Sequence, residues 1–383
     1  MGARRRRRCS FLLWVVLALV VAGCSAVPEV QLSPRPTAQG SASPPNYRQL
    51  DESIEKAIAS GSVGLDTIGA VLISLDGKTV LTHYRNGRRP DKTLHMWSVT
   101  KSFTSALIGI ALEEKIIRDL DQTLGELLPR YRPQMKGEVA GITLRQLMTM
   151  SAGFQDELGN PSLIGDVFRQ DGDAVAFILR RGLVSSPGET FAYSSSSAHL
   201  VTAVLAQALR EADGSNPLTV LDYATEKLFE PLGIDIRNAY TARFRPDDVE
   251  PFEKAGFGWA TDAQGINSGC CLLRLRPADM LKFGQLYLDH GTWHGRQLVP
   301  KKWVADSVAP SPTSSQYGYM WWLETTPSGD PAYAARGSGG ELIVVVPEHR
   351  LVVAVASQPT KDYATDDQDV FALVSDVILK AFA

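Results

Sequence analysis

The stretch from Ser102 to Leu112 places the strongest constraint on the fold, because it is apolar nearly all round, with Ser-Ala-Leu-Ile-Gly-Ile-Ala-Leu at its centre. A helix without a polar face is stable only when other elements surround it. We therefore expect this helix in the middle of a globular protein. The chain can supply such surroundings, since 44% of its 383 residues are hydrophobic and only 21% are charged.

Strand signals gather near the two ends of the chain. Ile68–Ser74 is a short apolar run, and the Asp76-Gly77 turn after it leads into a returning strand at Thr79–Tyr84. Three more runs rich in β-branched or aromatic residues lie late in the sequence, at 317–323, 342–346 and 351–356. Apolar residues at helical spacing occupy most of the chain between these strand signals and also occur at both ends of the domain. The predicted helices lie at 47–60, 144–150, 173–181, 198–211, 220–228, 277–288 and 367–382.

This order predicts one α/β (α+β) domain over residues 47–383, with an antiparallel sheet flanked by helices. The sheet part would consist of residues 47–100 and 300–383, so that both ends of the chain contribute strands. A mostly helical part, residues 101–299, would be inserted between them.

The first residues are typical of a targeting segment rather than of a folded domain. Arg4–Arg8 are positively charged, and the apolar run Phe11–Ala22 is shorter than the ~20 residues that a membrane-spanning helix needs. We therefore interpret residues 1–23 as a signal peptide. The sequence Val-Ala-Gly before Cys24 resembles the bacterial lipobox, in which the cysteine is lipidated and becomes the first mature residue; a plain signal peptide followed by a chance cysteine is the alternative.

A mature chain that begins at Cys24 would be acidic and tethered. Removal of five arginines changes the formal charge from −3 to −8, which excludes an electrostatic attraction to nucleic acid or to anionic lipid. Membrane association would therefore depend on the lipid at Cys24. Residues 24–46, rich in Pro and Ser, predict a flexible tether, and the domain would lie outside the cytoplasm, anchored to the bacterial cell membrane.

Only two of the four cysteines remain once Cys9 is assigned to the signal peptide and Cys24 to the lipid. They are the neighbours Cys270 and Cys271, so the chain is not a disulfide scaffold. Two interpretations stay open: a pair of small buried residues, or a strained vicinal disulfide formed outside the cytoplasm.

Several signatures of other enzyme classes are missing from the sequence. There is no G-x-S-x-G, no H-E-x-x-H and no G-x-x-x-x-G-K, and none of the six histidines has the spacing of a metal ligand. We expect neither a metal nor a cofactor.

The pattern S-x-x-K occurs where it can carry chemistry, at Ser98 and Lys101, just before the apolar helix. Their spacing puts both side chains on one helix face, and the helix N-terminus favours negative charge on Ser98. Burial should lower the pKa of Lys101 toward that of a base. The alternative is a capping serine with a snorkelling lysine. The same pattern at Ser53 and Lys56 lies on the first amphipathic helix and is attributed to chance.

Two further motifs strengthen the catalytic interpretation. Tyr193 lies on a loop before a helix, where it could relay protons, although a core tyrosine would fit as well. Three glycines in the segment 337–340 would let a substrate lie beside the strand edge and expose backbone N–H groups to an oxyanion. Taken alone, that segment would be a hairpin turn.

Together these motifs resemble the penicillin-binding protein and class C β-lactamase superfamily, with its esterase and 6-aminohexanoate-dimer-hydrolase-like members. The resemblance extends from about residue 48 to the C-terminus. It implies a β-lactamase/transpeptidase-like fold and a serine hydrolase with Ser98 as nucleophile, Lys101 as general base and Tyr193 as proton relay. The oxyanion would be bound by the N–H groups of Ser98 and of Ser338.

The chain departs from the family pattern at two positions. The tyrosine motif usually ends in asparagine, whereas Ser195 stands here. The late strand usually carries K-T-G or H-x-G, and here Arg336 with Gly337, or Ser338 with the glycines after it, takes that place. Both departures favour an esterase or amidase that acts on a small-molecule or peptide-like acyl substrate. A cell-wall D-Ala-D-Ala carboxypeptidase, a β-lactamase and a catalytically inactive envelope binding lipoprotein remain alternatives.

Overall fold

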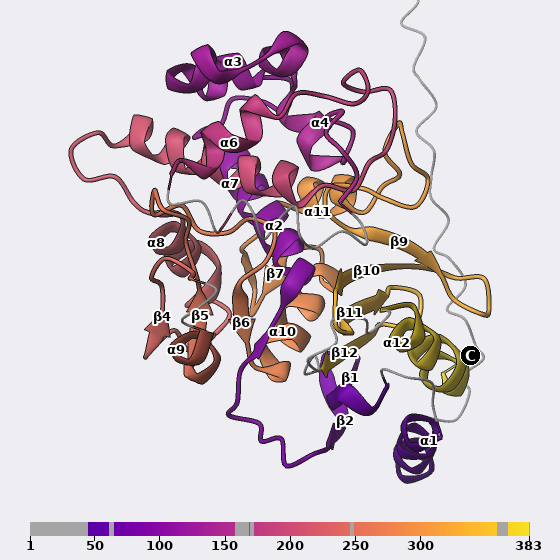
Figure 1. Ribbon diagram of the computed structural model, residues 1–383. Coiled ribbons are helices and arrows are strands. Elements are labelled where there is room, and N and C mark those ends of the chain that lie inside the picture. Colours follow the sequence, from indigo (N-terminus) through magenta and orange to yellow (C-terminus); the bar gives the residue numbers. More distant parts are fainter. Residues whose placement is uncertain are drawn as a thin grey trace, which may run out of the picture. The chain divides into compact units, whose positions relative to one another are not determined.

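A six-stranded antiparallel sheet forms the base of the domain in the computed structural model, which describes residues 45–60, 65–157, 168, 172–245, 249–357 and 367–382 (Figure 1). Its strand order is β2-β1-β12-β11-β10-β9. The strands come from both ends of the chain: β1 (Ile68–Leu75), β2 (Lys78–Tyr84), β9 (Trp322–Thr325), β10 (Pro331–Gly337), β11 (Glu341–Val346) and β12 (Leu351–Ser357).

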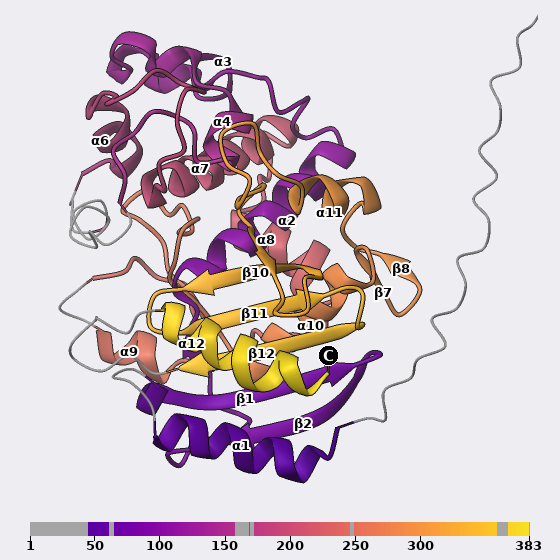
Figure 2. The same ribbon diagram turned by 90° about the vertical axis from the view of Figure 1, so that its right-hand side faces the viewer.

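Alternate side chains of the strands serve two separate cores, one on each face of the sheet. On β1, Val71 and Ile73 pack with helix α1 (Tyr47–Ala59) and with the C-terminal helical segment that begins as α12 (Asp367–Leu373). Figure 2 shows α12 across the late strands and α1 beside β1 and β2. Leu72 belongs to the core on the opposite face, where helix α10 (Pro277–Leu288) covers the sheet.

Helix α2 (Thr100–Glu113) is the central helix that the sequence predicts, since every residue from Thr100 to Ala111 is buried. Besides α10, further helices lie between α2 and β9 in the sequence, and two of them, at 195–212 and 301–307, pack against α2. The further helices are α3 (Leu124–Leu127), α4 (Leu144–Met148), α6 (Ala174–Arg180), α7 (Ser195–Ala212), α8 (Val220–Ala224), α9 (Val249–Lys254) and α11 (Lys301–Ser307), with 3₁₀ and π turns between them.

The middle segment also contains a small sheet, with strand order β3-β6-β5-β4, that the sequence patterns do not predict. Its strands are β3 (Leu94–His95), β4 (Ala239–Tyr240), β5 (Phe257–Trp259) and β6 (Leu273–Leu275). Strands of two or three residues are too short to show a period of two. The pairing of β3 with β6 ties the chain before Ser98 to the chain after Cys271.

The fold class is confirmed, with differences in detail. Helix α10 lies in the middle of the sequence and yet packs on the large sheet, so the helical segment is not a separate layer. The aromatic run 317–323 becomes a strand only at Trp322, because Met320 has a φ of 61° and turns the backbone beforehand. A small hairpin of β7 (Thr292–Trp293) and β8 (Arg296–Gln297) follows α10.

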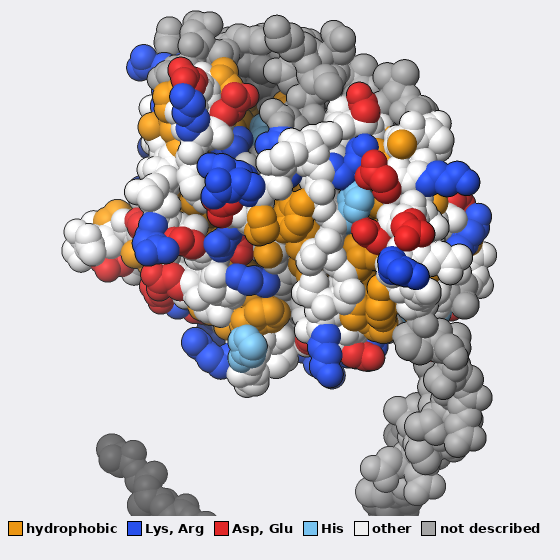
Figure 3. Space-filling view, turned by 90° about the horizontal axis from the view of Figure 1, so that it is seen from below, with side chains coloured by type: hydrophobic (Ala, Val, Ile, Leu, Met, Phe, Trp, Pro, Cys, Tyr) orange, Lys and Arg blue, Asp and Glu red, His pale blue; other side chains and the backbone are white. Residues whose placement is uncertain are grey.

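The predicted signal peptide, the lipidated Cys24 and the predicted tether as far as residue 44 lie outside the described part of the chain. Within the part that is described, none of the helices has the length and apolar character needed to span a bilayer. On the face shown in Figure 3, basic and acidic side chains are interspersed rather than gathered in a stripe of one sign.

One carboxyl group in the core has an unusual environment. Glu341 begins β11 opposite Gly337 and is fully buried. Neither of its side-chain oxygens has a hydrogen-bonding partner in another described residue, and burial raises the pKa of Glu341 well above its usual range. The protonated form is therefore the one that the fold stabilises.

Gly109 allows Trp303 of α11 to pack against the central helix. A Cβ at position 109 would lie 2.2 Å from Cγ of the indole ring. We predict that Gly109→Ala lowers the free energy of unfolding by about 1–3 kcal/mol, because the rigid ring must move. Gly141→Ala is the control, since nothing lies within 4 Å of its Cβ position. Urea unfolding measures both; equal stability of Gly109→Ala and wild type would contradict the packing.

Glu341 predicts a dependence of stability on pH. Because the folded-state pKa lies above the unfolded value of about 4.3, its stabilising contribution is complete below that pH and is lost as pH rises toward the folded pKa. The stability of wild type relative to Glu341→Gln should fall by up to about 1.4 kcal/mol per pH unit over this range. Urea unfolding of both proteins between pH 4 and 8 measures this difference. A difference that stays constant with pH would refute the buried titration.

Candidate active site

Ser98 and Lys101 meet at the beginning of the central helix. Ser98 lies in the 3₁₀ turn η2 (Trp97–Val99), which leads directly into α2. Nζ of Lys101 is 2.8 Å from Oγ of Ser98. The preceding Trp97 has a φ of 43°, which is unfavourable for a bulky residue and is typical of functional sites. Ser98 is half-buried, whereas Lys101 is only 1% exposed.

Three separate segments surround the buried amine of Lys101. Beyond Ser98, it donates to Oγ of Ser195 at 3.1 Å and to the carbonyl oxygen of Cys270 at 3.2 Å. It also lies 4.7 Å from the centre of the Tyr193 ring. The sequence motifs around 98, 193 and 270 are thus brought together at one nitrogen. An ammonium group has three N–H donors, and here three oxygens accept them.

The pKa of Lys101 differs from the expectation that burial would lower it. Burial is the largest influence and does lower the pKa, but the negative charges that Tyr193, Cys270 and Cys271 can carry outweigh it. The net effect raises the pKa of Lys101 above its ordinary value. The expected fall neglected the neighbours that distant segments supply.

Tyr193 is fixed by the loop that precedes α7. The hydroxyl of Ser194 caps the helix by accepting from the N–H of Ser197 at 3.0 Å. The Tyr193 ring stacks on Trp322 of β9, with centres 5.6 Å apart, and meets the edge of Tyr317 at 6.1 Å. These aromatic contacts leave Tyr193 6% exposed and restrict the ring to one orientation.

A buried ion pair that the motif analysis missed supports the same loop. The N–H of Glu157 donates to the carbonyl of Tyr193 at 2.7 Å. The Glu157 carboxylate accepts from the hydroxyl and the N–H of Ser196, at 2.5 and 3.0 Å, and from Arg181 at 3.1 Å. No local pattern marks Glu157, because its partners lie 24 to 39 residues away in the sequence.

The late strand β10 approaches the nucleophile at Gly337. A Cβ at this position would lie 2.7 Å from the carbonyl oxygen of Met96 and 3.3 Å from Cβ of Trp97, so only glycine allows the approach. Ser338 follows in the turn and is exposed. The structure therefore places the 337–340 turn beside the segment that carries Ser98.

Arg336 does not face the nucleophile. Its guanidinium donates to Glu324 at 2.9 Å and lies over Trp322 and, on the helix α12, Phe371. Its neighbour Ala335 belongs to the core on the other face of the sheet. The sequence-based assignment of Arg336 as a substrate-supporting residue thus has no support from this geometry, because alternate residues of a strand point to opposite faces.

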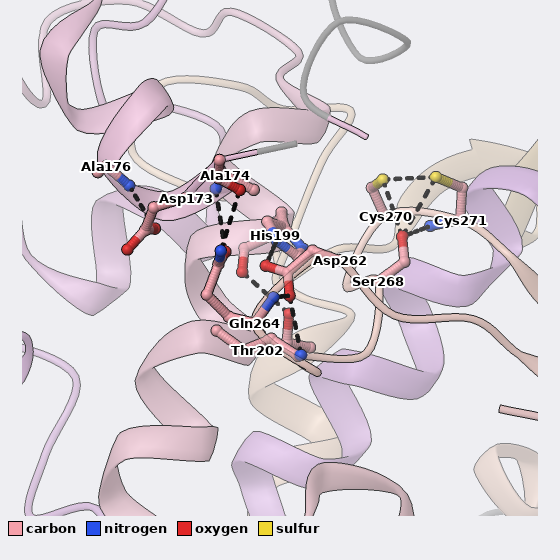
Figure 4. Close-up of polar contacts among 12 residues, drawn as sticks. Asp173, Ala174, Ala176, His199, Thr202, Asp262, Gln264, Ser268, Cys270 and Cys271 are labelled. Carbon is pink, nitrogen blue, oxygen red and sulfur yellow. Dashed lines mark hydrogen bonds and ion pairs between the residues drawn. The ribbon is translucent and has the colours of Figure 1, made fainter. Parts of the chain in front are cut away.

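Metal ligands do not gather anywhere in the described ranges, where no cluster of three or more His, Cys, Asp or Glu side chains could hold an ion. The buried pair His199 and Asp262, with Nε2 and Oδ2 3.0 Å apart, joins α7 to the 260s loop (Figure 4). It serves the packing of that loop rather than a metal site.

Comparison with known proteins places the chain in a family. The family model described as "Beta-lactamase" matches residues 55–375. The curated Protein flp of Staphylococcus aureus is 22% identical over 196 residues, which cover 49% of this chain but only 37% of flp. The chain therefore matches well under half the length of that relative.

Solved structures show the same fold. A candidate 6-aminohexanoate-dimer hydrolase from Bacillus anthracis is 21% identical, with a TM-score of 0.63 over 83% of this chain and 79% of that one. EstCE1, described as a hydrolase with promiscuous acyltransferase activity, is 17% identical, with a TM-score of 0.63 over 86% of this chain and 99% of its own. Since the family model spans the domain from α1 to the C-terminal helical segment, this chain belongs to the Beta-lactamase family.

Proposed function

We propose that this protein is an extracytoplasmic lipoprotein that hydrolyses ester or amide bonds through an acyl-enzyme on Ser98. One observation carries the proposal: the buried amine of Lys101 lies 2.8 Å from Oγ of Ser98 and 4.7 Å from the centre of the Tyr193 ring. A capping serine with a snorkelling lysine would leave the amine in water, whereas this amine is buried.

Lys101 and Tyr193 act together in this proposal. The amine lies 2.8 Å from Oγ of Ser98 and 4.7 Å from the centre of the Tyr193 ring, so both groups are close enough to take part in moving the serine proton. The Ser98 oxygen attacks the acyl carbon while its proton passes to the pair. The pair then returns the proton to the leaving alcohol or amine.

The developing oxyanion needs N–H donors beside Ser98. The N–H of Ser98 and that of Ser338, in the turn after β10, are the proposed donors. The close approach of Gly337 to Met96 supports this arrangement, because it brings the end of β10 against the nucleophile segment. Water then attacks the acyl-enzyme and releases the acid.

The surroundings of the site favour an uncharged substrate. Arg336, the cation that could hold a carboxylate, is paired with Glu324 and packed against Phe371. Half-buried Phe191 and Trp322 instead place apolar surface beside Tyr193. A carboxypeptidase or a β-lactamase must recognise a carboxylate, so an esterase or amidase with an apolar acyl or alcohol part fits better.

Hydrolysis of short-chain p-nitrophenyl esters by the full-length chain in detergent tests the nucleophile. We expect Ser98→Ala to lose at least about 10³-fold in kcat/KM and Tyr193→Phe about 10²-fold or more, because nucleophile and proton relay are removed. Ser53→Ala is the matched control, since Ser53 and Lys56 repeat the motif on exposed α1 and should keep the wild-type rate.

The same experiment separates the enzyme from a binding lipoprotein. If wild type and Ser98→Ala are equally inert, and a fluorophosphonate does not label Ser98, the fold serves as a binding module. Penicillin acylation of Ser98 at rates comparable to the ester would favour the β-lactamase or carboxypeptidase alternative.

The lipid anchor is a proposal from the sequence around Cys24, which lies outside the described residues. We predict that wild type incorporates labelled palmitate in a bacterial host and sediments with membranes. Cys24→Ala should incorporate none and be released from the membrane pellet, because one thiol carries the lipid. Cys9→Ala is the control and should behave as wild type. Palmitate incorporation by Cys24→Ala would contradict the assignment.

A further inference from the structure

Two neighbouring thiols lie directly behind the catalytic lysine. Sγ of Cys270 and Sγ of Cys271 are 2.6 Å apart, and the hydroxyl of Ser268 lies 3.3 Å from each (Figure 4). Both cysteines are free. Cys270 is buried, whereas Cys271 is half-buried and can be reached from solvent.

The backbone of this pair is part of the active site. The carbonyl of Cys270 accepts from Nζ of Lys101 at 3.2 Å, and the carbonyl of Gly269 accepts from Thr104 of α2 at 3.0 Å. On the other side of the pair, the N–H of Leu272 donates to Nε2 of His95 at 3.1 Å. Burial, together with the charge of Arg274, lowers the pKa of His95 to about 3, so this ring stays a neutral acceptor.

The segment has little freedom to absorb a local change. A Cβ at Gly269 would lie 2.1 Å from the carbonyl oxygen of Ala198, which shows how closely α7 confines the backbone. Leu272 has a φ of 63°, a left-handed conformation that is rare for a bulky residue. Strain of this kind persists only where the surroundings hold it, and it is typical of functional segments.

We propose that Cys270 and Cys271 form a reversible oxidation site, which a disulfide donor converts to a vicinal disulfide that slows hydrolysis at Ser98. The proposal rests on the proposed function and extends it to regulation. A disulfide between neighbours closes a ring that contains the peptide bond between them. The carbonyl that holds Lys101 belongs to that peptide bond, so ring closure reorients the oxygen and withdraws it from the amine.

The oxidation is balanced by a disulfide-bearing co-reactant, such as oxidised glutathione. The Cys271 thiolate attacks one sulfur of the donor, forms a mixed disulfide and expels one donor thiolate. The Cys270 thiolate then attacks the Cys271 sulfur and expels the second donor thiolate. The protein loses two protons and two electrons, and the donor becomes two thiols. Compartments outside the cytoplasm, where the chain is proposed to lie, are oxidising, so disulfides form and persist there.

The experiment uses the full-length chain with Cys9→Ala and Cys24→Ala, so that only the pair can react. Protein in detergent is treated with oxidised glutathione or with a reductant, and its intact mass and ester hydrolysis are compared. We expect a mass lower by two hydrogens and a rate lower by about tenfold or more, the effect of one lost hydrogen bond to a charged group. Reductant should restore both.

A matched variant isolates the disulfide from other effects of oxidant. Cys271→Ala, in the same background, keeps the Cys270 carbonyl but cannot form the disulfide, so its rate of ester hydrolysis should be the same after oxidised glutathione as after reductant. Phenylarsine oxide, which binds two neighbouring thiols, should inhibit the reduced parent and not Cys271→Ala. A rate loss in Cys271→Ala equal to that of the parent would overturn the proposal.

The ¹³Cε resonance of Lys101 reports the contact between its amine and the Cys270 carbonyl, whether or not the protein hydrolyses an ester. The resonance is assigned by its loss in Lys101→Arg. It should shift when the disulfide forms. A mass that stays unchanged, or that gains one glutathione and stops there, would overturn the oxidation site. A disulfide that leaves the resonance and the rate unchanged would overturn the coupling. If neither state hydrolyses ester, the proposed function has failed, while the resonance still decides whether the pair acts on Lys101.

Discussion

The buried amine of Lys101 is the interaction on which the rest of the site depends. A charge at this depth is unstable unless oxygens satisfy it, and the three that do so come from Ser98, Ser195 and Cys270. Helix α2 can be apolar all round because its one buried cation is satisfied at the end where three segments converge. The segments around residues 195 and 270 are held against the nucleophile for the same reason. The contacts that stabilise the buried amine are therefore also the contacts that position the proposed catalytic groups.

The sequence predicts best what is local. The central helix, the Ser98–Lys101 spacing and most helix ranges follow from patterns within a few residues, and the structure contains them. What it predicts poorly is which face a residue takes once distant strands pair. Arg336 is one position from Gly337 and yet turns to the other side of the sheet, because the pairing of β10 with β11 fixes the alternation. Glu157 carries no local signal at all, since its partners Arg181 and Ser196 become neighbours only in the fold.

The pKa of Lys101 likewise depends on residues that are distant in the sequence and that local patterns do not reveal. The sequence of the helix alone predicts that burial lowers the pKa of Lys101. The fold adds Tyr193 and the two thiols, and the charge they can carry reverses the direction. The surroundings that set this pKa therefore extend well beyond the S-x-x-K motif, to segments that only the fold brings close.

The departures from the family pattern are consistent with one another. Ser195 is shorter than asparagine, yet it still reaches the lysine, so the internal contact is kept while an amide side chain that could extend toward substrate is absent. The late strand offers no free cation on the nucleophile's side, because Arg336 is committed to Glu324 and to Phe371. Recognition must then come from shape and apolar contact, which the aromatic residues around Tyr193 provide. A site of this kind discriminates weakly among acyl groups of similar size, since a hydrophobic wall separates substrates by only about 1–3 kcal/mol per methylene. In the proposed function, the site would therefore make and break an acyl bond without a charge that restricts which bond it takes.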